Sequence, residues 1–241
     1  MSESDLQQPL FLVAALSCGA LWALESLFPF FKNRQARLKH ALVNLLVGAF
    51  NTLLSSLSAV GLFFVLAEIR PYWQGLKGVI DNPIFASVVL VTCLDLWAYL
   101  WHRLNHQVAF LWRFHRFHHC DSEMDVTTGF RFHPIEILLS ELFRLPIFAL
   151  LGIGATELLL YNLLSFPVIL LHHSNVALPK SFDSALSYLI PSPNFHRLHH
   201  SVLQSEMNSN YGSMLSVWDR LFGSMQWRNV PNDLRLGVEE S

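Results

Sequence analysis

The stretch PIFASVVLVTCLDLWAYLWHRLNH, residues 83–106, contains the pattern that decides the fold of this chain. Residues 83–101 form an apolar run, and at ~1.5 Å per helical residue a run of this length nearly crosses a hydrocarbon layer of about 30 Å. The run continues into His102 and His106, whose i,i+4 spacing places both imidazoles on one face of a helix. The pattern therefore predicts a membrane helix that carries two candidate metal ligands at one end.

Four further apolar runs flank this segment. Residues 10–31 and 41–67 precede it, and each is long enough to span a membrane. Residues 135–153 and 158–171 follow it, and the glycines between them predict a helical hairpin.

The hairpin segments are more polar than the first three runs. Glu141 and Arg144 are spaced i,i+3, so we expect them to pair, which lowers the cost of placing charges at membrane depth. Pro146 and Pro167 are expected to kink their helices, which neighbouring helices tolerate in a membrane.

The composition also favours a membrane protein. Of the 241 residues, 52% are hydrophobic and 14% are charged, whereas about 25% are charged in typical soluble domains. The net charge is −2 and the sixteen lysines and arginines form no long basic run, which argues against nucleic acid as a partner. The three cysteines have no pairing pattern, so no disulfide framework is expected.

The charges of the first loop predict the orientation. This loop is basic and contains Lys32, Arg34, Arg37 and Lys39. The positive-inside rule places such a loop in the cytoplasm. Counting spans from there brings His102, His172 and His173 to the same side, so we expect the histidines to meet at the cytoplasmic face.

Histidine is the most unusual feature of the sequence. The chain has twelve histidines, and all except His40 lie between positions 102 and 200. Two of the groups have the pattern HxxHH, at His115, His118 and His119 and at His196, His199 and His200. Their i, i+3, i+4 spacing places each triplet on one helix face. We interpret His40 as an ordinary polar residue.

The number of imidazoles predicts the kind of site. The two triplets and the pair at 102 and 106 supply eight nitrogen donors before His172 and His173 are counted. A structural zinc site closes with four ligands, so this set indicates two metal ions with open coordination positions. Imidazole binds iron, zinc, copper and nickel, and the sequence pattern alone does not choose among them.

At these positions the chain resembles the fatty acid hydroxylase and sterol desaturase superfamily of integral membrane oxygenases. The similarity lies in DLWAYLWHRLNH (95–106), LWRFHRFHHCDSEMDVTTGFRFHPIE (111–136), HHSN (172–175) and SPNFHRLHHSVLQSEMNSNYGSMLSVWDRLFGS (192–224). It implies an all-α integral membrane bundle of about four to five helices under a cytoplasmic histidine-rich helical cap. We expect N-terminal transmembrane helices in residues 1–82, a catalytic domain in 83–225 and a C-terminal tail in 226–241.

The resemblance also implies a ligand set for a di-iron centre, in which zinc could substitute. The implied ligands are His102, His106, His115, His118, His119, His173, His196, His199 and His200. Further ligands, or groups that orient the ligands, are expected at Asp95, His133, His172 and Asn175. Arg131 and Glu136 are expected to orient ligands as well. The fold of the cap is expected to depend on Asn210, Tyr211, Trp218, Asp219 and Gly223.

Asp95 has two explanations, because a carboxylate in an apolar helix is costly without a partner. It either bonds a ligand imidazole or makes a polar contact between helices. Trp97, Tyr99, Trp101, Phe110 and Trp112 similarly either line a lipid entry route or mark the membrane interface, where aromatic side chains are common.

The implied function is oxidation of an unactivated C–H bond of a lipid, by hydroxylation or desaturation, with dioxygen as co-substrate. Sterols, fatty acyl chains, alkylglycerols and carotenoids all remain open as substrates. The sequence shows no haem, flavin or nicotinamide motif, so electrons are expected from a separate reductase, cytochrome or ferredoxin-like donor. The short loops favour a bacterial inner membrane over an endoplasmic reticulum for this multi-pass protein.

Two other hypotheses use the same histidines. A zinc-dependent membrane hydrolase would work without oxygen. A metal carrier would need ligands along a path through the bilayer, whereas the predicted ligands gather at one face.

Overall fold

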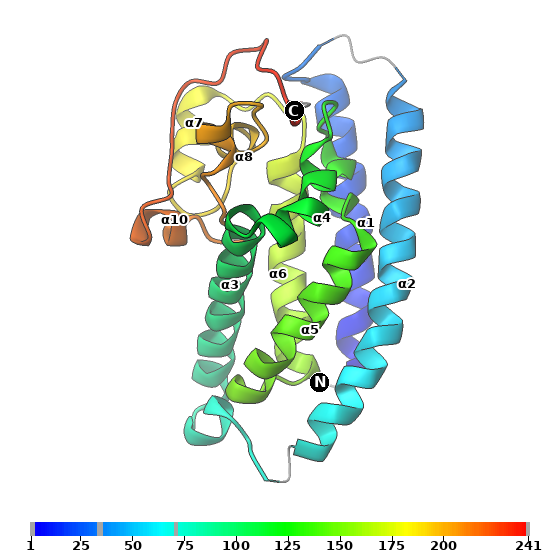
Figure 1. Cartoon of the computed structure of the whole chain (residues 1–241), viewed down its shortest axis with the longest axis vertical. Coiled ribbons are helices and arrows are strands. Elements are labelled where there is room, and N and C mark those ends of the chain that lie inside the picture. Colours follow the sequence, from blue (N-terminus) through cyan, green and yellow to red (C-terminus); the bar gives the residue numbers. More distant parts are fainter. Residues whose placement is uncertain (1–2, 33–35, 70–71, 240–241) are drawn as a thin grey trace.

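Five long helices form the body of the protein (Figure 1). The computed structural model describes residues 3–32, 36–69 and 72–239. The long helices are α1 (Glu3–Leu27), α2 (Arg37–Ile69), α3 (Pro83–Gln107), α5 (Pro134–Leu151) and α6 (Ala155–His173). Four segments are long and apolar enough to cross a membrane: Pro9–Leu27, Arg37–Ser58, Pro83–Gln107 and Ala155–His173. The predicted all-helical membrane bundle is confirmed.

Short helices build a cap at one end of the bundle and connect the long ones. They are α4 (Ala109–His119), α7 (Lys180–Leu186), α8 (Pro193–His199), α9 (Gln204–Met207), α10 (Val217–Leu221) and the 3₁₀ helices η1 (Leu76–Val79) and η2 (Val126–Phe130). Figure 1 shows α7, α8 and α10 gathered beside the upper ends of α3 and α6.

The long helices alternate in direction, with α1, α3 and α6 running toward the cap and α2 and α5 running away from it (Figure 1). The end of α1 and the start of α2, which flank the first loop, therefore lie at the cap end, where Phe30 N donates to Asn175 O at 2.8 Å. The prediction that this loop shares one end with the histidine-bearing segments is confirmed. The side of the membrane on which that end lies stays a prediction. Arg34, one of the four basic residues of the loop, lies outside the described residues.

Local sequence signals explain the boundaries of the helices near the site. Asn82 caps α3 by accepting the backbone N–H of Phe85 at 3.0 Å, and Pro83 occupies the first turn. The apolar run then continues into the histidine pair at 102 and 106 with no break, so the pair is rigidly attached to a membrane helix. Pro146 and Pro167 lie inside α5 and α6.

Apolar side chains cover both the inside and the outside of the bundle. Leu90, Leu94 and Phe148 belong to a buried cluster at the end opposite the cap. On the outside, Phe11 of α1 is 70% exposed and Leu46 of α2 is 62% exposed. Such exposure suits helices whose outer faces contact lipid. The predicted ion pair also forms, with Arg144 Nη2 donating to Glu141 Oε1 at 2.8 Å.

We predict that Gly152→Ala destabilises the hairpin between α5 and α6. Gly152 has a φ of 73°, in the left-handed region that favours glycine, and a Cβ there would lie 2.0 Å from the carbonyl oxygen of Gln74. The clash and the strain together should lower the free energy of unfolding by about 2–4 kcal/mol, measured as a lower thermal midpoint in detergent.

The matched control is Gly19→Ala in α1. A Cβ at Gly19 meets no atom within 4 Å. Alanine is favoured over glycine inside a helix by roughly 0.5–1 kcal/mol, so this variant should be as stable as the unmodified protein or slightly more stable. Equal stability of the two variants would contradict the turn described here.

Candidate metal centre

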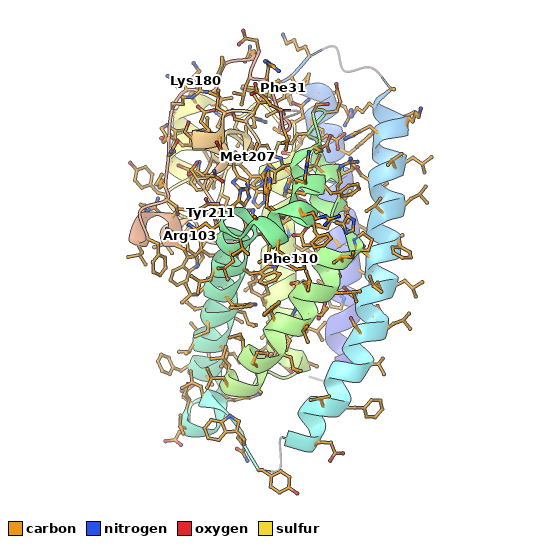
Figure 2. The ribbon with its side chains drawn as sticks, viewed as in Figure 1. Phe31, Arg103, Phe110, Lys180, Met207 and Tyr211 are labelled. Atoms are coloured by element: carbon orange, nitrogen blue, oxygen red, sulfur yellow. The ribbon has the colours of Figure 1, made fainter. Side chains whose placement is uncertain are left out.

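Four elements converge where the bundle meets the cap. α3 brings His102 and His106 on its last turns, and α6 ends with His172 and His173. α4 and α8 each carry an HxxHH triplet at their C-terminal ends. In Figure 2, Met207 and Tyr211 of the cap lie near the upper end of α3.

The histidines form two groups, and within each group the candidate ligand atoms lie within 4.8 Å of one another. The first group contains His102, His106, His115, His119 and His199. The second group contains His118, His173, His196 and His200. The structure thus brings together all nine histidines that the resemblance implied as ligands and divides them into two groups.

Most of the cluster is shielded from water. Seven of the nine side chains are buried, and only His102 and His106 are half-buried. His119 and His200 connect the two groups, since their rings stack with centroids 4.4 Å apart. Both ring nitrogens of these two residues lie in the interior with no hydrogen-bond partner among the described residues.

Most of the rings are oriented by an oxygen outside the cluster. In six rings the Nδ1–H group donates to an oxygen at 2.7 to 3.3 Å. The donor and acceptor pairs are His102 with Tyr211 O, His106 with Asn208 Oδ1, His115 with Glu136 Oε1, His118 with Arg131 O, His173 with Ile169 O, and His199 with Ser209 O. These oxygens can only accept, so the single proton of each neutral ring sits on Nδ1. Each Nε2 therefore presents a lone pair to the interior of the cluster.

Two close contacts between these nitrogens need a positive charge beside them. His118 Nε2 lies 3.1 Å from His173 Nε2, and His102 Nε2 lies 2.9 Å from His199 Nε2. In both pairs each Nδ1 already holds the ring proton, so two lone pairs face each other. A metal ion that accepts both lone pairs resolves the repulsion, and the donor set therefore fits two bound metal ions.

A proton is a poor substitute for a metal ion at this place. Burial lowers the pKa of His118 and of His199 well below the ordinary value, and the neighbouring histidines lower both further. The protein thus disfavours the imidazolium form that would otherwise relieve the contact.

Glu136 and Arg131, which were expected to orient ligands, do contact them. Glu136 accepts the Nδ1–H of His115 at 2.8 Å, and the Arg131 carbonyl accepts that of His118 at 3.1 Å. A carboxylate behind an imidazole fixes the tautomer and raises its basicity toward a metal ion.

His172 and His133 lie at different distances from the two groups. His172 is buried, its ring lies 4.0 Å from that of His196, and its Nδ1 has no partner among the described residues. His133 belongs to neither group, and its Nδ1 accepts the backbone N–H of Ile135 at 3.1 Å. It therefore serves as the N-terminal cap of α5.

Asp95 and Asn175 hold the backbone around the site and do not bond the ligand rings. Asp95 accepts the Trp218 indole N–H at 2.8 Å and the backbone N–H groups of Met214 and Leu215 at 3.1 Å. Of its two explanations, the structure supports the polar contact between segments. Asn175 exchanges two hydrogen bonds with the backbone of Phe31 at 2.9 and 3.0 Å.

No sequence pattern predicted the polar network that supports η2. His40 contacts Asp121 at 2.8 Å and Asp125 at 3.1 Å, so it is a satisfied polar residue as interpreted. Burial disfavours the charged form of Asp121, but the hydrogen bonds from His40 and Thr128 outweigh it and hold the pKa of Asp121 well below its usual value. Asn44 donates to Thr127 at 3.1 Å in the same network.

A cavity of about 320 Å³ opens directly beside the histidine groups. α3, α5 and α6 line it, and His102, His118 and His173 lie at one end. Trp97 and Trp101 line it as well. Tyr99, Phe110 and Trp112 do not: Tyr99 is fully buried, Phe110 is 60% exposed, and the Trp112 ring lies 5.0 Å from that of His106. The cavity could hold an apolar chain next to the candidate metal positions.

Comparison with known proteins identifies the family. The family model for fatty acid hydroxylase matches residues 87–224, which is more than half of the chain. The chain belongs to the fatty acid hydroxylase family. The match includes every residue of the two histidine groups. No solved structure matches the chain.

Several curated proteins resemble this member of the fatty acid hydroxylase family. The ornithine lipid hydroxylase OlsE of Rhizobium tropici is 33% identical over 158 residues, which are 65% of this chain and 46% of that protein. The alkylglycerol monooxygenase of Homo sapiens is 26% identical over 138 residues, 56% of this chain and 29% of the relative. A cholesterol 25-hydroxylase-like protein of Danio rerio is 27% identical over 186 residues, 72% of this chain and 70% of the relative. The chain spans less than half the length of the first two relatives, whose names are those of oxidoreductases.

We predict that chelator-treated protein loses stability on acidification. Burial, and the neighbouring histidines after it, lower the pKa of His118, His119, His196, His199 and His200 in the folded state. The unfolded chain has the ordinary value of about 6.5, so it binds more protons below that pH. The free energy of unfolding is therefore highest above about pH 7. It falls as the pH drops below this value, by about 1.4 kcal/mol per pH unit for each histidine.

The check is the thermal midpoint in detergent between about pH 8 and about pH 5, with and without added Zn²⁺. Bound metal should flatten the dependence near neutral pH, because ligated nitrogens cannot take up protons. A midpoint of chelator-treated protein that does not change over this range would show that the imidazoles are not held neutral by the fold.

Proposed function

We propose that this protein is a membrane-bound di-iron oxygenase that uses dioxygen and external electrons to hydroxylate or desaturate a C–H bond of a lipid. The observation that carries the proposal is the set of inward-facing Nε2 lone pairs in two adjoining groups, beside a cavity within a membrane bundle. The names of the relatives support lipid hydroxylation as the reaction class. Of the substrates left open by the sequence, an alkylglycerol and a sterol each match a relative's name, and the name of a third relative adds an ornithine lipid.

The nine histidines of the two groups are the proposed ligands. Two iron ions held there would supply the activation of dioxygen and the oxidation of a C–H bond that no side-chain acid or base can achieve. The residues of the chain fix the geometry of this site. The oxygen acceptors behind the Nδ1 atoms lock the rings, and Glu136 does so with a full negative charge at 2.8 Å from His115. Zinc could occupy the same ligands.

The cavity and the cap have separate tasks in this proposal. The cavity admits a lipid from the membrane and holds a carbon atom against the histidine end. The cap covers the opposite side of the cluster and excludes water, because residues such as Phe195 and Leu198 of α8 are buried there. Excluding water protects the reacting centre from side reactions.

Location and partners are also proposals. The basic first loop lies at the cap end, which supports a cytoplasmic position for the histidine site. We propose a bacterial inner membrane, and a separate reductase, cytochrome or ferredoxin-like protein as the electron donor. Residues 83–225 would act as the catalytic domain, with residues 1–82 as N-terminal membrane helices and 226–241 as a tail.

The first experiment measures metal content and oxygen uptake together. Purified protein should contain about two iron ions per chain, as two ligand groups imply, and should consume oxygen when reductant and a membrane lipid extract are both present. Omitting the lipid is the control. Full occupancy by zinc with no oxygen uptake after iron reconstitution would sink the oxygenase and favour a zinc-dependent membrane hydrolase.

A second experiment tests the ligand set through Glu136→Gln. The amide keeps the shape but removes the charge that holds His115 Nδ1–H, so we expect the affinity for iron or zinc to fall about 10–100-fold, measured by competition with a chelator of known affinity. Glu141→Gln is the matched control, because Glu141 is a buried carboxylate of the same helix that pairs with Arg144 and touches no histidine of the two groups. Equal affinity in both variants would remove Glu136 from the site.

A further inference from the structure

The cavity beside the histidine groups contains a polar position far from them. One face of α5 lines the cavity with Glu136, Ser140, Arg144 and Phe148, at intervals of four residues. Arg144 lies eight positions after Glu136, so the two positions are about 12 Å apart along the helix axis. Beyond Arg144 the lining is apolar and includes Leu94, Phe148 and Leu158.

Arg144 has donors to spare at this position. Its guanidinium donates to Glu141 Oε1 at 2.8 Å, and its side chain is 26% exposed. A guanidinium carries five N–H groups, and one bond to Glu141 uses only one of them. Charged groups at membrane depth are costly, and those that are kept there commonly face a cavity and serve a function. Arg144 can thus donate to a molecule that enters the cavity.

Asn162 of α6 lines the same cavity and adds an amide to it. An amide side chain provides two N–H donors. Tyr161, its neighbour in sequence, also lines the cavity, and its hydroxyl donates to Asp95 at 3.5 Å. The donors of Arg144 and Asn162 therefore meet the cavity from two helices.

The charge balance selects the kind of acceptor. Glu141 neutralises Arg144, so a carboxylate in the cavity would add an uncompensated negative charge at membrane depth. A neutral carbonyl oxygen accepts the same N–H groups without this cost. An alkane offers no acceptor at all.

We propose that Arg144 and Asn162 bind the ester or amide carbonyl of a lipid substrate and thereby determine which carbon faces the histidine groups. This inference rests on the proposed function. It assigns the substrate to the ester-linked or amide-linked lipids. Because the Arg144 position lies about 12 Å along α5 from that of Glu136, which contacts His115, the reacting carbon is expected many bonds away from that carbonyl. Arg144 and Asn162 are specificity-determining residues in this scheme and touch no histidine.

A binding experiment tests the proposal without turnover. The probes are three hexadecyl compounds brominated on the chain: the methyl ester of hexadecanoic acid, the free acid, and hexadecyl methyl ether. Trp97 and Trp101 line the cavity, so a bromine atom bound there should quench tryptophan fluorescence. The ester should bind about ten-fold more tightly than the ether, because its carbonyl oxygen projects from the chain toward the charged donor, whereas the ether oxygen lies between two alkyl groups.

The variant that removes the charge pair is Glu141→Gln with Arg144→Met. It takes away the guanidinium without leaving a buried carboxylate alone, and the ester and the ether should then bind with nearly equal affinity. Asn162→Leu should reduce the preference in part. Lys77→Met with Glu157→Gln is the matched control, since it removes an ion pair with a separation of 2.7 Å whose residues do not line the cavity. This control should keep the ten-fold preference.

Three results would overturn the proposal. They are equal binding of ester and ether to the unmodified protein, full preference in the Glu141/Arg144 variant, and tighter binding of the free acid than of the ester. None of these measurements needs metal or oxygen, so the proposal can fail while the oxygenase stands. Failure of the oxygenase would instead appear as absent oxygen uptake with an intact ester preference.

Discussion

Buried imidazoles that face one another with their lone pairs repel, and the arrangement of this protein depends on resolving that repulsion. Two pairs of Nε2 atoms lie 2.9 and 3.1 Å apart, and the Nδ1 atoms of all four rings already donate elsewhere. In the proposed metal centre a bound cation relieves this repulsion, and burial disfavours a proton in this role. We therefore expect a bound metal ion to stabilise the cap, because the proposed ligands come from four separate elements.

The oxygen acceptors behind the rings need support of their own. The Tyr211 and Ser209 carbonyls, which hold His102 and His199, belong to one loop of the cap. Asp219 holds this loop by accepting the backbone N–H groups of Tyr211 and Gly212 at 2.7 and 2.8 Å. Asp95 fixes the following residues from α3. Asp95 and Asp219 thus help to orient the imidazole rings, although neither carboxylate contacts a ligand ring. This role explains why both acidic residues are buried.

The sequence predicted the parts of the structure that depend on periodicity and residue type. Apolar runs such as 83–101 predicted the membrane helices, and the HxxHH spacing predicted which imidazoles share a helix face. Of the acceptors of the Nδ1 protons it indicated Glu136 and Arg131 but not the other four, because most of those are backbone carbonyls, which every residue possesses. Asp95 illustrates the same limit. Its burial in a helix was predictable, but its partners at positions 214, 215 and 218 are more than a hundred residues away and depend on tertiary structure.

The N-terminal helices do more than anchor the protein, although the family match begins only at residue 87. Asn44 of α2 accepts a hydrogen bond from Arg131 Nη1 at 3.1 Å, and the Arg131 carbonyl in turn accepts the Nδ1–H of His118. His40 binds the carboxylates of Asp121 and Asp125, which hold the turn of η2 between α4 and α5. A change in α2 can therefore reach His118 through two hydrogen bonds. The family match covers residues 87–224, but the geometry of the histidine site also depends on α2, which precedes that range.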